Sequence, residues 1–113
     1  MMNKCSWGVV MLGMLGMMAS VPVLHAQSSP ARNVLDSITY AKMAVEHGSH
    51  GHTGGLVKHA EKSRNYAKRG GNNPHLTEGI THLNEAIEHG KAGHADVATQ
   101  HLESALVHLT EVQ

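Results

Sequence analysis

Histidine is the residue type in this chain that could do chemistry, because of the number and spacing of its side chains. The sequence has 113 residues and 11 histidines, against 9 lysines and arginines and 9 aspartates and glutamates. Neutral imidazole is a good ligand for Cu(II), Ni(II) and Zn(II). The candidate metal ligands are the ten histidines beyond residue 26: His47, His50, His52, His59, His75, His82, His89, His94, His101 and His108.

In the second half of the chain the histidines recur every seven residues. The two series are His75, His82 and His89, and then His94, His101 and His108. Seven residues advance about 10.5 Å along a helix and drift about 20° around it, so neighbours in one series share a stripe but cannot hold one ion. A shared ion therefore needs a ligand from a second helix.

Two such stripes can face each other across an antiparallel helical hairpin with its turn at Gly90–Gly93. Residues equally far from the turn then meet in three predicted pairs: His89/His94, His82/His101 and His75/His108. Helix axes about 8–10 Å apart bring opposed imidazoles within reach of one ion. The first half predicts the corresponding pairs His47/His52, Tyr40/His59 and Asn33/Tyr66, with His50 in its turn.

We expect both hairpin turns to lie at one end of the fold. That end would then gather the densest group of ligands and the tightest site, formed by His47, His50, His52, His89 and His94. We also expect Glu78 and Glu85, four residues before His82 and His89, to accept the second ring N–H or complete the ligand shell.

The helices that must position these rings are visible as apolar residues spaced by three or four. The four apolar stretches span residues 34–45, 56–67, 76–87 and 98–112, with Ser63 in one apolar position. Residues 33–68 align without a gap on 75–110 with ten identities, which indicates an internal duplication. The sequence predicts an all-α fold, an up-down-up-down four-helix bundle built from two duplicated helical hairpins. The alternative is a hairpin that dimerises.

Residues 1–26 have the layout of a secretory signal peptide. Lys4 precedes an apolar run of 13 residues, Trp7–Ala19, and Ala26 stands at the expected cleavage position. The run is too short for a permanent anchor across about 30 Å of hydrocarbon, although an uncleaved anchor remains the alternative. We predict a signal peptide at 1–26 and one histidine-rich four-helix metal-binding domain at 27–113. Export without cysteine in that domain favours the bacterial periplasm.

The ligand types select among metals. Cys5 lies in the predicted signal peptide, and Met43 is the one methionine beyond it, which argues against thiolate sites and against a dedicated Cu(I) carrier. Imidazole and carboxylate favour divalent ions, among which Cu(II) has the highest affinity. We therefore expect copper(II), with nickel and zinc as alternatives.

The second half resembles a known family. The stretch AIEHGKAGHADVATQH at Ala86–His101, preceded by GITHLNEA, is similar to the small metal-binding protein of ammonia-oxidising bacteria. Most of residues 38–110 share the similarity. The matching histidines are His82, His89, His94, His101 and His108. That family is periplasmic, helical and histidine-rich and binds several copper ions and other divalent metals, so the resemblance implies metal buffering or sequestration. Tyr40, Tyr66 and the histidine-free tail depart from it and leave the number of ions open.

We therefore expect a periplasmic protein that buffers divalent transition metals and is not an enzyme. Paired Glu-x-x-His motifs, as in di-iron bundles, and His-Glu-x-x-His are both absent from the sequence. A formal charge of zero with neutral histidine gives no basic surface for nucleic acid, and no membrane contact is expected after signal cleavage. The alternative is a periplasmic stress or chaperone-like helical protein whose histidines sense pH.

Overall fold

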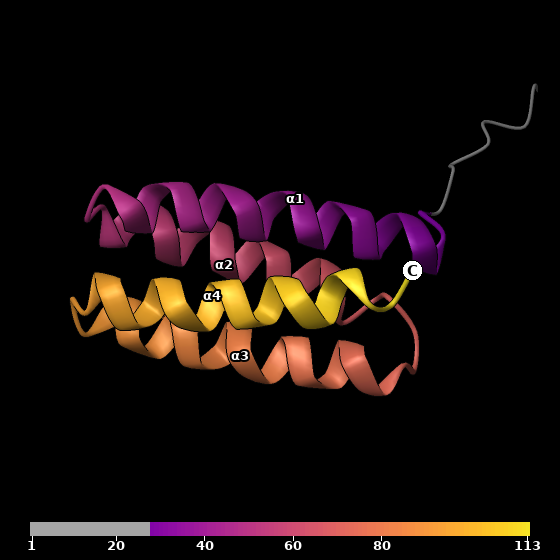
Figure 1. The fold of residues 1–113 in the computed structure, drawn as a ribbon. Coiled ribbons are helices and arrows are strands. Elements are labelled where there is room, and N and C mark those ends of the chain that lie inside the picture. Colours follow the sequence, from indigo (N-terminus) through magenta and orange to yellow (C-terminus); the bar gives the residue numbers. More distant parts are fainter. Residues whose placement is uncertain (1–27) are drawn as a thin grey trace, which may run out of the picture.

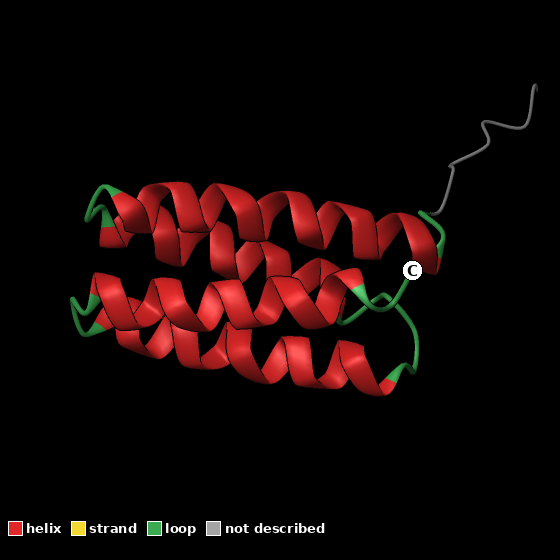
Figure 2. Cartoon of the chain, viewed as in Figure 1, coloured by secondary structure: helices red, strands yellow, loops and turns green. Residues whose placement is uncertain are grey.

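The computed structural model describes residues 28–113, which form four α-helices and, within that range, no strand (Figures 1 and 2). The helices are α1 (Pro30–Ser49), α2 (Thr53–Ala67), α3 (Pro74–Lys91) and α4 (Ala95–Thr110). In this part of the chain no helix is both long and apolar enough to cross a membrane. The predicted signal peptide lies outside the described residues.

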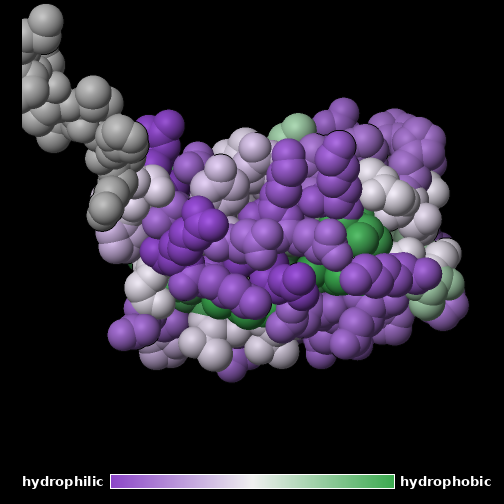
Figure 3. All heavy atoms as spheres, turned by 180° about the vertical axis from the view of Figure 1, so that it is seen from behind, coloured by the Kyte–Doolittle hydropathy of each residue, from purple (hydrophilic) through white to green (hydrophobic). Residues whose placement is uncertain are grey.

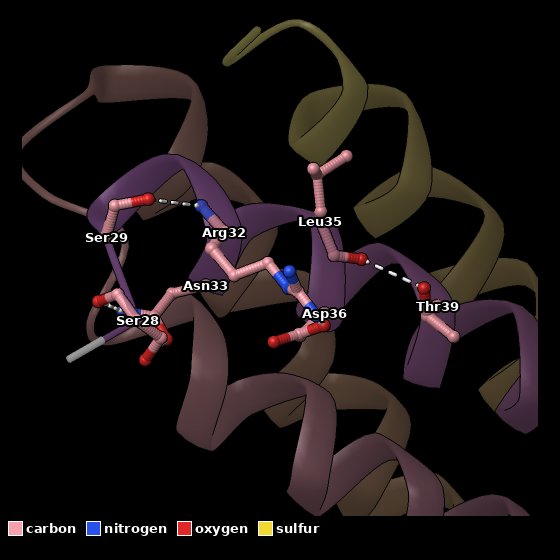
Figure 4. A network of polar contacts seen from close by, with 7 residues as sticks. All are labelled: Ser28, Ser29, Arg32, Asn33, Leu35, Asp36 and Thr39. Atoms are coloured by element: carbon pink, nitrogen blue, oxygen red, sulfur yellow. Dashed lines mark hydrogen bonds and ion pairs between the residues drawn. The ribbon is translucent and has the colours of Figure 1, made fainter. Parts of the chain in front are cut away.

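Helices α1 and α3 begin at polar caps followed by proline. Ser29 Oγ accepts a hydrogen bond from the Arg32 N–H at 3.2 Å (Figure 4), and Asn73 Oδ1 accepts one from the His75 N–H at 2.9 Å. These side chains satisfy backbone donors that the first helical turn leaves unpaired. Proline follows each cap because its ring fixes φ near the helical value and its missing N–H costs nothing there.

Both short connections between helices use the same backbone hydrogen bonds. The N–H of His52 donates to the carbonyl of His47, and the N–H of His94 donates to that of His89, each at 2.9 Å. The glycine that precedes each donor residue has a left-handed φ, which is 71° at Gly51, before His52, and 82° at Gly93, before His94. This is the Schellman pattern, in which a glycine ends one helix and turns the chain back. It ties two histidines of each connection together through the backbone.

The four helices pack as a bundle around a core of leucine and alanine. Helix α1 packs on α2 and α4, and α3 packs on the same two helices. The most buried large side chains are Leu56, Leu76, Leu83, Leu102 and Leu109. Figure 1 shows the α1–α2 and α3–α4 connections at one end of the bundle and the α2–α3 connection at the other. The all-α prediction is therefore confirmed, and each histidine series lies on packed, regular helices.

One apolar position is filled by serine, as the sequence indicated. Ser63 is fully buried and its hydroxyl donates to the carbonyl of Ser37 at 2.7 Å, while the Ser37 hydroxyl donates to the carbonyl of Ser63 at 2.9 Å. Burying a hydroxyl is tolerable only when it is hydrogen-bonded, and here each serine satisfies the other. The pair joins α1 to α2 inside the core.

The outer surface of the bundle is mainly polar. The face turned away from the viewer in Figure 1 carries mostly hydrophilic residues, with hydrophobic residues confined to narrow strips between them (Figure 3). Exposed large hydrophobic side chains are few among residues 28–113: Leu35, Met43, Val97 and Val107.

Two glycines give opposite expectations for substitution by alanine. A Cβ at Gly90 would lie 2.7 Å from Val57 Cγ2 and 2.9 Å from Leu56 Cδ2, whereas a Cβ at Gly54 would meet nothing within 4 Å. We expect Gly90→Ala to cost about 1–3 kcal/mol of unfolding free energy through overpacking. The matched control Gly54→Ala should gain up to about 0.5–1 kcal/mol through helix propensity. Urea unfolding of metal-free protein measures both, and equal effects would contradict the close approach of α2 and α3.

Candidate metal centre

The six histidines of the α3–α4 hairpin, with His94 at the N-cap of α4, form a continuous row of rings. Ring centroids of the three expected pairs are 5.8 Å apart for His75/His108, 5.8 Å for His82/His101 and 5.9 Å for His89/His94. Two further contacts join these pairs to one another, at 5.6 Å for His82/His108 and 5.3 Å for His89/His101. The rings that the spacing predicted to face each other across the hairpin do so.

A carboxylate joins the central pair of this row. Glu85 Oε2 lies 3.1 Å from Nδ1 of His82 and 2.9 Å from Nδ1 of His101. One ligand atom from each of the three residues lies within 4.8 Å of the other two, so the group could hold a metal ion. All three side chains are half-buried, which keeps the group accessible to an ion from solvent while its helices hold it in place.

The partner of Glu85 differs from the expected one. We expected its carboxylate beside His89, four residues later, but it contacts His82, three residues earlier, and His101. Side chains on an α-helix lean toward its N-terminus, so a glutamate reaches back over the preceding turn. For Glu78 the structure gives no contact with His82, and its side chain is exposed.

A second group lies at the open end of the same hairpin. Glu111 Oε2 is 2.8 Å from Nδ1 of His75, and Nδ1 of His108 is 3.5 Å from the same His75 atom. These three residues also bring ligand atoms within 4.8 Å of one another. Glu111 was not among the expected ligands. A usable signal was present, because His-Leu-Asn-Glu at His82–Glu85 and His-Leu-Thr-Glu at His108–Glu111 place histidine and glutamate at the same spacing.

Helices α1 and α2 carry a different row of rings. Centroid distances are 5.5 Å for Tyr40/Tyr66, 6.1 Å for Tyr40/His59, 5.0 Å for His47/His59 and 6.3 Å for His47/His52. Among residues 28–113, groups of three nitrogen or carboxylate ligand atoms within 4.8 Å are found on α3 and α4 and in the segment just after α4, and none on α1 and α2. The row on α1 and α2 is thus built from rings without a bridging carboxylate.

The expected pair Asn33/Tyr66 does not form. Asn33 is buried, and its side-chain amide donates to the carbonyls of Ser28 and Arg69, at 3.3 Å and 3.1 Å. A buried amide is retained where it satisfies backbone carbonyls, and here it ties the start of α1 to the residues after α2. Asn33 is therefore a structural residue in this fold.

The turn-end histidines of the two hairpins do not gather into one group. Each ring contact among the described residues joins two rings of the same hairpin. The physical reason lies in Gly48 and Gly90, which follow His47 and His89 and are buried against the neighbouring hairpin. A Cβ at Gly48 would overlap Thr99 of α4. Since one residue turns about 100° around a helix, the preceding histidines point away from that interface.

His59 has a buried ring nitrogen, Nδ1, without a hydrogen-bond partner among the described residues. Burial, and then the nearby charges of His47, Lys62 and Lys58, lower the pKa of His59 below its ordinary value of 6.5. The neutral ring that this favours is the form that binds metal.

Together, a four-helix bundle with two groups of imidazole and carboxylate ligand atoms has the features of a helical metal-binding protein. The chain belongs to the small metal-binding protein family, whose model matches residues 2–112. A search of curated proteins finds no match to this sequence. The family resemblance drawn from the histidine pattern is thereby confirmed.

The lowered pKa of His59 predicts how stability depends on pH. His59 binds a proton more readily in the unfolded chain than in the folded one, so its contribution to the free energy of unfolding depends on pH. This contribution is complete above the unfolded pKa of about 6.5 and is lost as pH falls toward the lowered folded pKa. In metal-free protein, His59→Asn should therefore lose less unfolding free energy than wild type between about pH 7 and pH 5.

Urea unfolding followed by circular dichroism at several pH values measures this difference. His50→Asn is the matched control, because it removes an exposed imidazole from the same hairpin. An equal change of slope in both variants would contradict the effect assigned to His59.

Proposed function

We propose that this protein binds and buffers divalent transition metals through histidine pairs of neighbouring helices. The observation that carries the proposal is the group of His82, Glu85 and His101, in which two imidazoles and one carboxylate from two helices converge. Membership of the small metal-binding protein family supports the same function. The remaining ring pairs of α3 and α4 supply further sites of the same kind.

We propose Cu(II) as the preferred ion, with Ni(II) and Zn(II) as alternatives. Nitrogen and oxygen donors suit these divalent ions, and for a given set of such donors the affinity order places Cu(II) highest. The Nδ1 atoms of His82 and His101 now donate to Glu85, so the second ring nitrogens are free to accept an ion while the carboxylate orients both rings. Alternatively, Glu85 itself supplies the third ligand.

Buffering fits this arrangement better than catalysis. A catalytic metal is usually held in a closed, asymmetric site with one open position and a shaped cavity for substrate. The two ligand groups here resemble each other and lie at the surface, with His75 and Glu111 exposed. The family description names metal binding and no reaction. We therefore propose a binding protein rather than an enzyme.

The proposed cellular setting is the bacterial periplasm. It rests on the signal-peptide layout of residues 1–26, with residues 27–113 as the exported metal-binding domain. We also propose that the bundle has up-down-up-down topology and arose by duplication of one hairpin. The ten identities between residues 33–68 and 75–110 support the duplication, and the matching backbone bonds of the two turns agree with it.

The shared site predicts that its two histidines act as a unit. We expect His82→Asn and His101→Asn each to lose the central ion, so that the double variant loses about as much bound metal as either single variant. The metal-to-protein ratio after equilibration with Cu(II) and removal of free ion measures this. The control pair His82→Asn and His47→Asn affects two hairpins and should give additive losses. Additive losses from His82 and His101 would show that they bind separate ions.

The carboxylate of Glu85 predicts a second effect. Glu85→Gln keeps the shape of the side chain but removes its charge, and we expect about 10-fold or more weaker binding of a divalent ion at the central site. Competition with a coloured chelator measures the affinity. Glu103→Gln is the matched control, since Glu103 is exposed and lies two residues after His101. Equal affinities in the two variants would exclude Glu85 from the site.

A further inference from the structure

A hollow at the turn end of α1 and α2 contains the one thioether of the described residues. Its volume is about 310 Å³, and it is lined by Met43, Glu46, His47, His50 and His52. Met43 is 38% exposed, so its side chain is not fully packed into the core. Methionine is rare here, since residues 28–113 contain no other methionine and no cysteine. The one thioether side chain of this range therefore lines a hollow together with three histidines.

One histidine beside this hollow has the orienting hydrogen bond that metal-bound histidines usually make. Nδ1 of His50 lies 2.8 Å from the carbonyl oxygen of Glu46, to which it can donate its proton. In that tautomer Nε2 is left with its lone pair, and the hydrogen bond fixes the orientation of the ring. His52 lies beside it at 6.1 Å between centroids, and His47 is 6.3 Å from His52. Three imidazoles thus border one hollow, and their ligand atoms are not all within 4.8 Å of one another.

The hollow differs in ligand chemistry from the groups on α3 and α4. In the alignment of residues 33–68 with 75–110, Met43 takes the position of Glu85, the carboxylate that joins His82 to His101. A hard oxygen donor in one hairpin thus corresponds to a soft sulfur donor in the other. Soft thioether ligands select Cu(I), whereas carboxylates suit harder divalent ions.

We propose that this hollow is a Cu(I) site formed by the Met43 thioether and the imidazoles of His47, His50 and His52. The proposal rests on the proposed function, because it requires that the chain binds transition metals. It adds that the two hairpins bind different kinds of ion. Cu(I) binds at the turn end of α1 and α2, and divalent ions bind along α3 and α4. The ion arrives already reduced, so no electron transfer within the protein is required.

This assignment refines the expectation drawn from the sequence. One methionine in 86 described residues argues against a carrier built from repeated thioethers. It does not exclude a single mixed site, because imidazoles can supply the remaining ligands. The linear sequence does not show that Met43, four residues before His47, lines the same hollow as His50 and His52.

The test is an anaerobic Cu(I) titration of the full chain against a coloured Cu(I) chelator. Cys5→Ser is present in every sample, which removes the chain's one thiol. We expect Met43→Leu to lower the Cu(I) affinity by about 10- to 100-fold. It should also reduce the sulfur contribution to the copper X-ray absorption spectrum relative to wild type, since the six methionines of residues 1–26 are the same in both samples. Zn(II) and Cu(II) binding at the His82–His101 group should stay unchanged.

The matched control moves the sulfur along the same helix. Leu35 is exposed like Met43 and lies eight residues earlier on α1, so Met43→Leu with Leu35→Met keeps the composition and displaces the thioether from the histidines. This double variant should not recover the Cu(I) affinity. Recovery, an unchanged affinity in Met43→Leu, or a sulfur contribution in Met43→Leu equal to that of wild type would each overturn the proposal.

A second comparison separates this proposal from the proposed function. The variant His82→Asn with His101→Asn should keep the Cu(I) affinity of wild type, and a loss equal to that of Met43→Leu would place Cu(I) on α3 and α4 and overturn the proposal. Zn(II) and Cu(II) titrations of the same variant measure the divalent-ion sites. The test of the proposed function is therefore independent of the test of the Cu(I) site.

Discussion

One backbone hydrogen bond in each hairpin turn sets the height at which side chains of adjacent helices meet. The bond from the His94 N–H to the His89 carbonyl fixes where α3 ends and α4 begins, and its counterpart joins His52 to His47. Once this register is fixed, each step of seven residues away from the turn brings another pair of rings to the same level. The metal chemistry of α3 and α4 therefore depends on a turn whose left-handed glycine makes the bond possible.

The tilt of helical side chains then decides which pairs acquire a carboxylate. Glu85 and Glu111 each follow a histidine by three residues, and their side chains lean back toward the preceding turn. Glu85 contacts His82 of its own helix and His101 of the neighbouring helix, and Glu111 contacts His75 of the neighbouring helix. The hairpin of α1 and α2 has the same register but holds Met43, and Arg69 just after α2, at the corresponding positions. One scaffold thus offers two kinds of ligand environment, and the difference lies in a few side chains rather than in the fold.

Much of the site could be predicted from the sequence, because the ring pairs follow from helical periodicity and symmetry about a turn. His82 and His101 met as expected for this reason. The contacts of Glu85 and Glu111 could not be read from histidine spacing alone, since they depend on side-chain direction. The expected gathering at the turn end failed because the space between the hairpins is filled at Gly48 and Gly90 by side chains of the opposite helices. Such packing across an interface leaves no periodic trace in a single sequence.

Because the rings on α3 and α4 form one continuous row, the ways in which metal ions could occupy it are limited. Each of the four inner rings has a neighbour on both sides, but an imidazole whose other nitrogen is hydrogen-bonded has one lone pair to give. Pairing from the ends inward engages all six rings around three ions. The shifted pairing, His82 with His108 and His89 with His101, accommodates two ions and strands His75 and His94. Under the proposed function, ions bound along this row of rings would therefore compete for ligands, and an ion at one position would dictate which pairing its neighbours can adopt.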